Sequence, residues 1–140
     1  MTVRGKRLAV AAVALGLALI MGAPTCASLG QDEVPLQHDG YVILRLRVGN
    51  GGMTAEQRVE EIQLRVQDLM SQQFAQESRD IVGQISARKW GSEMVIGTPD
   101  CLLLTVTRAD AKANHSSVPR LARYWRNRMV EVMIIATRTG

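Results

Sequence analysis

A chain of 140 residues, with 46% hydrophobic and 21% charged residues, has the size and composition of one globular domain. Its net charge is +4, but three of its 17 Lys and Arg residues stand at the N-terminus, ahead of an apolar run. Without that leader, 14 basic residues face 13 acidic ones and the net charge is +1. A domain so close to neutral argues against a nucleic-acid partner.

The first 27 residues have the three zones of a secretory leader. Positive charges come first, an apolar run follows over residues 8–21, and small, turn-forming residues continue to Ser28. We expect residues 1–27 to be either a signal peptide cleaved after Ala27 or a retained membrane anchor, because the apolar stretch is near the shortest length that spans a bilayer. Both alternatives place the domain outside the cytoplasm, in the periplasm or the extracellular space.

The chain has two cysteines, Cys26 and Cys101. Cleavage after Ala27 would remove Cys26, so that no disulfide could form within the mature chain. In an alternative interpretation Cys26 is the lipidated first residue of a bacterial lipoprotein, although residues 23–25 fit that signal poorly. Cys101 precedes three leucines, and we expect it to be a buried thiol that acts as a small hydrophobic residue.

Residues 28–40 are polar and predict a tether, followed by a single domain over residues 41–138. Hydrophobic residues alternate over residues 41–48, which predicts a strand with one buried face. The predicted buried face holds Val42, Leu44, Leu46 and Val48, and the wetter face holds Tyr41, Ile43, Arg45 and Arg47. Residues 49–52 then form a glycine-rich turn that matches no phosphate-binding fingerprint.

The rest of the chain predicts two helices and three strands. A helix begins with a capping box at Thr54 and Gln57 and continues to Gln73. Strands are expected over residues 81–87, 94–97 and 101–107, followed by a polar loop over residues 108–117 and a helix from Ser117 to Arg138. The predicted order is β-α-β-β-β-α. It indicates an α+β two-layer sandwich, in which two helices cover one face of a small, mostly antiparallel sheet.

The sequence predicts no cofactor and no metal site. His38 and His115, the two histidines, are not spaced from other ligand residues as a zinc site requires. Two alternatives to a purely binding role stay open. One is a small enzyme that uses Glu93, Asp100 or Asp110 in a cleft, and the other is a ligand-binding protein with an apolar pocket between sheet and helices.

The C-terminal helix is unusually rich in arginine. It carries Arg120, Arg123, Arg126 and Arg128 within nine residues. One interpretation is a contact surface for anionic lipid headgroups or an acidic partner. The other is an ordinary solvated helix face whose charges pair with acids such as Glu131.

Three stretches together resemble a known pattern. The first is Asp39-Gly40 followed by a strand and then by GGMTAEQR at residues 51–58. The second is LLTVTRADA at residues 103–111, and the third is LARYW at residues 121–125. In this order they resemble the extracytoplasmic N-terminal region of bacterial small-conductance mechanosensitive channels of the cyanobacterial type. We expect no pore helices after this domain, so we carry over no channel activity from the resemblance. It implies a periplasmic module that accompanies membrane proteins.

We therefore expect a non-enzymatic, exported interaction or sensing module, accessory to a membrane protein or envelope complex. The sequence leaves its oligomeric state open.

Overall fold

The computed structural model describes residues 33–76 and 79–139, so the predicted leader and Cys26 lie outside the described residues. The described chain has two antiparallel sheets, β1–β2 and β3–β4–β5, which confirms the α+β class. None of its helices combines the length and apolar character needed to span a membrane. The elements are β1 (Val34–His38), β2 (Tyr41–Leu46), α1 (Ala55–Ala75), a short 3-10 helix η1 (Val82–Gln84), β3 (Ser86–Trp90), β4 (Glu93–Gly97), β5 (Leu102–Val106), α2 (Arg108–Ala113) and α3 (Val118–Thr139).

The first strand, β1, lies in the segment predicted to be a tether. It pairs with β2 through a two-residue turn at Asp39 and Gly40, whose φ values of 48° and 80° are both positive. Such a turn has the twist that an antiparallel hairpin needs, and Asp-Gly is a favoured sequence for it. Leu36 of β1 is fully buried. The tether prediction was therefore wrong for residues 34–38, which belong to the domain.

A β-bulge changes which side chains of β2 are buried. The pairing register shifts between Leu36 and Gln37, so that Leu36 faces Leu44 but Gln37 faces Val42. The extra residue, Ile43, turns into the core and is only 2% exposed. Strict alternation placed Ile43 on the wetter face, and it fails here because a bulge inserts one residue into the period-two pattern.

Helix α1 begins as predicted. The Thr54 hydroxyl accepts a hydrogen bond from the Gln57 amide, and the Gln57 side chain accepts one from the Thr54 amide. Near the other end, the Gln73 side-chain oxygen accepts from the amides of Ile81 and Val82. These amides are therefore not available for a strand ladder, since side-chain bonds of this kind compete with regular pairing.

The strand predicted over residues 81–87 is accordingly displaced. Residues 82–84 form η1, and the strand β3 runs from Ser86 to Trp90. Ile81, Val82 and Ile85 are all buried, which fits one turn of helix better than alternation along a strand.

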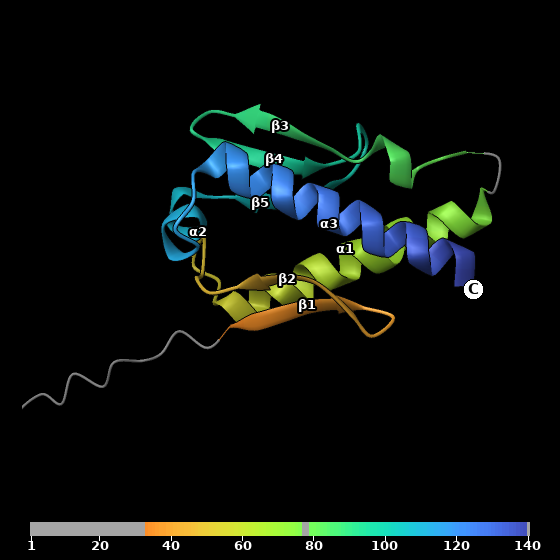
Figure 1. Cartoon of the computed structure of the whole chain (residues 1–140), viewed down its shortest axis with the longest axis horizontal. Helices are drawn as coiled ribbons and strands as arrows, with labels where there is room; N and C mark the ends of the chain where they lie inside the picture. Colours follow the sequence, from red (N-terminus) through yellow and green to blue (C-terminus); the bar gives the residue numbers. More distant parts are fainter. Residues whose placement is uncertain (1–32, 77–78, 140) are drawn as a thin grey trace, which may run out of the picture.

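Figure 1 shows α3 crossing in front of the three-stranded sheet, with the β1–β2 hairpin at the opposite side of the molecule and α1 behind α3. Helix α3 packs against β2 and against all three strands of the β3–β4–β5 sheet, whereas α1 packs against β1, β2 and β5. The prediction of one sheet under two helices is thus replaced by two separate sheets held together by two long helices. The core between them includes Val66, Ile96, Leu104 and Met129.

A short helix, α2, lies where a polar loop was predicted. Thr107 caps it: its hydroxyl accepts from the Asp110 amide, and Asp110 accepts from the Thr107 amide. The predicted start of the following helix is close to the observed one, at Val118.

Candidate functional site: an arginine groove around Tyr124

The four arginines predicted as a contact surface differ in exposure and in the contacts they make. Arg120 and Arg123 are exposed on the outer face of α3. Arg126 is partly buried, and its Nε donates to the carbonyl oxygen of Ile85 at 2.7 Å. Arg128, on the opposite flank of the helix, pairs with Glu131 at 2.8 Å. Arg126 therefore holds η1 to α3, which is a structural role.

Two arginines of the β2 segment, Arg45 and Arg47, join Arg128 from across the fold. All three line one hollow of about 370 Å³, together with Asn114 and Tyr124. Sequence reasoning placed Arg45 and Arg47 on a wet strand face. It had no signal that would bring residue 45 near residue 128, because α3 reaches β2 only through tertiary packing.

Tyr124 projects between this hollow and a second one. The second hollow has a volume of about 280 Å³ and is lined by Arg120, Ser116 and again Tyr124. The tyrosine side chain is 64% exposed, and its neighbour Trp125 is 2% exposed and belongs to the core, as predicted. We call the surface formed by Arg45, Arg47, Arg120, Arg128 and Tyr124 the arginine groove.

The groove has more cationic than anionic groups. Glu33 pairs with Arg47 and lies 3.7 Å from Arg45, and Glu131 pairs with Arg128. The four guanidinium groups thus meet two carboxylates, and Arg120 has no ion-pair partner among the described residues. An anionic ligand can reach these arginines without unfolding any part of the domain, since every one of these ion pairs is at least partly exposed to solvent.

Arg47 is held more firmly than its neighbours. One terminal nitrogen donates to the carbonyl oxygen of Ala113 at 2.9 Å, which ties β2 to α2. Its Nε is buried and has no hydrogen-bond partner in the described part of the chain. The bond to Ala113 and the ion pair with Glu33 therefore hold the head group of Arg47 in position in the groove.

A second cluster of charges was missed by sequence reasoning. Arg58 of α1 and Asp110 of α2 form a two-pronged ion pair with N–O distances of 2.8 and 3.0 Å, and the residues are 5% and 1% exposed. Arg58 also donates to the carbonyl oxygens of Val48 and Thr105, and Asp110 accepts from Thr107. The only available signal was the Thr-x-x-Asp spacing at residues 107–110, which marks a helix start.

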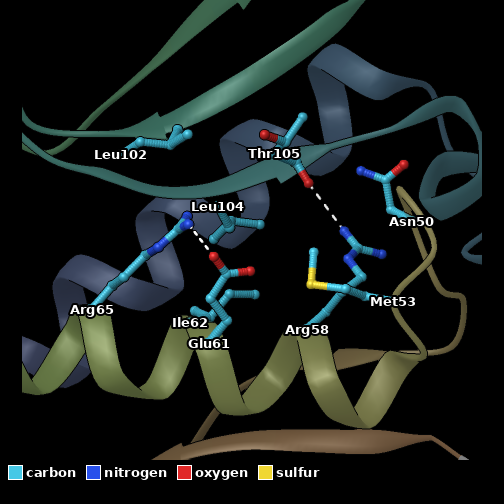
Figure 2. Close-up of a pocket in the computed structure, with 9 residues that line it drawn as sticks. All are labelled: Asn50, Met53, Arg58, Glu61, Ile62, Arg65, Leu102, Leu104 and Thr105. Carbon is cyan, nitrogen blue, oxygen red and sulfur yellow. Dashed lines mark hydrogen bonds and ion pairs between the residues drawn. The ribbon is translucent and has the colours of Figure 1, made fainter.

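This ion pair argues against Asp110 as a catalytic acid in the enzyme alternative. Asp110 is enclosed and its carboxylate is fully engaged by Arg58 and Thr107, so it does not face a cleft. Arg58 itself lies at the edge of a cleft of about 180 Å³ between α1 and β5. Figure 2 shows Arg58 reaching from α1 to Thr105, and Arg65 bonded to Glu61 one turn along the helix.

The arginines of this cleft cover an exposed sheet edge. Strand β5 pairs with β4 on one side only, and on the other side the carbonyl oxygens of Thr105 and Leu103 accept from Arg58 and Arg65 at 3.1 and 3.4 Å. Unpaired edge groups of this kind promote association between sheets, and covering them is a common protection. We therefore assign the cleft in Figure 2 a structural role.

The other two acids of the enzyme alternative, Glu93 and Asp100, line a third hollow. This broad hollow lies over the three-stranded sheet, but the two acids lie at opposite ends of β4, and Cys101 lies beside Asp100. Cys101 is partly buried, less enclosed than expected. Burial raises the pKa of its thiol, the nearby Asp68 raises it further, and Arg65 opposes this shift. Among residues 33–76 and 79–139, no three His, Cys, Asp or Glu side chains come together as a metal site would require.

The comparison with protein families gives one match. A family model described as "Domain of unknown function (DUF8459)" matches residues 35–136. The chain belongs to this family. The DUF8459 match includes β1, in agreement with the structure and against the predicted tether. It names no activity, so the resemblance to mechanosensitive channels stays a prediction. No curated protein and no solved structure matches the chain.

Proposed function

We propose that this DUF8459 domain is a non-enzymatic interaction module that works outside the cytoplasm, as an accessory part of a membrane protein or envelope complex. The arginine groove is its contact surface. The observation that supports this most is the convergence of Arg45 and Arg47 with Arg120 and Arg128 around an exposed tyrosine, although the two pairs lie far apart in the sequence.

The chemistry of the groove favours an anionic partner. A guanidinium group is planar and always charged, and it offers paired donors to carboxylate or phosphate oxygens. Tyr124 adds an apolar ring with a polar tip, which is typical of residues that carry binding energy at interfaces. Arg47 is positioned by its bond to Ala113 before any partner arrives, so less side-chain freedom is lost on binding.

The export signal predicted for residues 1–27 and the resemblance to channel-associated domains support an envelope location for this partner. They do so from the sequence alone, since those residues lie outside the described chain.

The test is a co-purification from gently solubilised membranes of the host, using the full chain and a charge-reversed variant. We expect the wild-type chain to bring down an integral membrane protein in constant ratio, and the double variant Arg45→Glu/Arg128→Glu to lose it. Arg126 is left intact in this design, because its bond to Ile85 makes it part of the fold.

The matched control reverses two charges outside the groove. Arg123 and Arg138 are exposed on α3 and line neither of the hollows around Tyr124. Arg123→Glu/Arg138→Glu should keep the partner. Circular dichroism and a thermal melt of each variant show that the fold survives. Recovery of the wild-type chain alone, or equal recovery of the partner with the groove variant, contradicts the proposal.

A further inference from the structure

A broad hollow lies on the β3–β4–β5 sheet, on the face turned away from α3. It has a volume of about 700 Å³, within the range of about 300–1,000 Å³ typical of small-molecule sites. Arg88, Val95 and Thr105 are paired across the three strands, and all line this hollow. Their neighbours Ile96 and Leu104 point the other way and are buried in the core.

An exposed aromatic side chain stands at one end of this face. Trp90 ends β3, lines the hollow and is 72% exposed, more than any other large hydrophobic residue in the described part of the chain. Leu102 of β5 lines the same hollow and is 45% exposed. The ring of Trp90 therefore contributes little to the core, and exposed aromatic residues of this kind are enriched at binding surfaces.

Polar side chains line the hollow at both of its ends. Glu93 is the direct cross-strand partner of Trp90 and Lys89 precedes Trp90, whereas Asp100 lies in the β4–β5 turn at the opposite end of β4. None of these three side chains forms an ion pair within the described segments. Arg88 also lines the hollow and donates a hydrogen bond to the carbonyl oxygen of Thr98 at 2.8 Å. The lining therefore has two cationic and two anionic side chains and is neutral as a whole.

We propose that this hollow binds an oligosaccharide, with Trp90 as the platform for a sugar ring. A pyranose ring has an apolar face of C–H groups, which fits against an indole ring, and a rim of hydroxyl groups that both donate and accept hydrogen bonds. Carboxylates at Glu93 and Asp100 accept from such hydroxyls, and Lys89 donates to them. The balanced charge of the lining complements a neutral ligand, whereas an acidic or a basic partner would meet like charges.

Edge-to-edge pairing of two copies is a poorer explanation of this surface. Two β3 strands placed antiparallel about their central residue would set Arg88 opposite Arg88 of the second copy, with Lys89 nearby. Like charges directly opposite each other destabilise a strand pair, and charged residues on an edge strand are a known protection against it. The site is independent of the arginine groove, which lies on β2 and α3.

The experiment is a titration of the purified full chain with chitotetraose, cellotetraose and maltotetraose, in a detergent that has no sugar headgroup. Tryptophan fluorescence reports on binding, because Trp90 is exposed while Trp125, the other tryptophan, is 2% exposed. We expect a saturable change in emission with at least one of these sugars, and protection of Trp90 from quenching by acrylamide.

The variants are measured by calorimetry, since one of them removes the fluorescent reporter. Trp90→Ala should weaken binding by about tenfold or more, and Trp90→Phe should retain most of it. Phe74→Ala changes another exposed aromatic residue, on α1 and outside both surfaces, and should leave binding unchanged. Absence of binding with all three sugars at millimolar concentration overturns the proposal. So does equal affinity in Trp90→Ala, or a wild-type dimer that Trp90→Ala dissociates, since the face would then be covered by a second copy.

Discussion

Arg58 of α1 and Asp110 of α2 meet inside the core, where two N–O contacts of 2.8 and 3.0 Å join the guanidinium group to the carboxylate. The same two side chains also bond the end of the β2 segment at Val48, the outer edge of β5 at Thr105 and the cap of α2 at Thr107. One ion pair thus connects four parts of the chain that have no hydrogen-bonded sheet in common.

Removal of one partner of this pair should destabilise the domain strongly. In Asp110→Ala the charge of Arg58 stays buried without its partner, and breaking a buried pair in this way costs roughly 3–5 kcal/mol. Urea unfolding of the purified chain measures this loss. The exposed pair of Arg128 and Glu131 gives the control, because Glu131→Ala should cost about 1 kcal/mol or less.

The double variant Arg58→Met/Asp110→Leu completes this test. It removes both charges together and should be more stable than Asp110→Ala alone, because no buried charge is then left unpaired. If the double variant loses as much as the two single changes added together, the pair is not coupled as the contacts indicate.

The arginines of α3 should separate into structural and free ones. Arg126→Met loses the bond from Nε to the Ile85 carbonyl and should lower the free energy of unfolding by about 1 kcal/mol. Arg123→Met, on the exposed face, should change it by less than about 0.5 kcal/mol. Thermal melts of the two variants measure this difference. Equal melting temperatures would contradict a structural role for Arg126.

The thiol of Cys101 should respond to its two charged neighbours in opposite directions. Its pKa is raised, by burial first and by Asp68 second, so that less thiolate is present at a given pH and alkylation is slow. Asp68→Asn should lower this pKa and speed the reaction with iodoacetamide near pH 8. Arg65→Met should raise the pKa and slow the reaction. The rates are measured over a pH series in a Cys26→Ser background, so that only Cys101 reacts.

The bulge at the end of β4 should not tolerate a side chain. A Cβ atom at Gly97 would overlap the carbonyl oxygen of Cys101, which accepts the amide of Thr98 in the tight turn that follows. Gly97→Ala should therefore cost about 1–3 kcal/mol in an unfolding titration. The control is Gly40→Asn in the β1–β2 turn. Its φ is also positive, but nothing lies near a Cβ there, and Asn tolerates this conformation, so its cost should stay below about 1 kcal/mol.

The sequence predicted the elements whose signals are local. The capping box at Thr54 and Gln57, the apolar stripe of α3 with Trp125 in the core, and the turn at residues 98–100 all depend on neighbours within a few positions, and all are observed. The glycine-rich segment before α1 is also a plain turn, closed by two backbone bonds of 3.0 Å between Asn50 and Met53.

The errors concern contacts over longer distances. The β1–β2 bulge that buries Ile43 and the side chain of Gln73 that bends residues 81–84 away from a strand are both set by tertiary packing. Only part of the arginine groove was predicted. The sequence indicated Arg120 and Arg128 as contact residues, but it did not link Arg45 and Arg47 to them. The hollow beside Trp90 could not be foreseen, because the sequence does not show which face of a strand stays uncovered.

The position of α3 also has a consequence for the order in which the molecule becomes stable. This helix covers the β1–β2 hairpin as well as the three-stranded sheet, yet Leu46 at the end of the hairpin and Val118 at the start of α3 are 72 positions apart (118 − 46). A two-stranded hairpin is at best marginally stable alone, and closing so long a loop is slow. We therefore expect the earliest strands of this domain to be synthesised to be among the last to gain protection from hydrogen exchange, when the C-terminal helix docks on them.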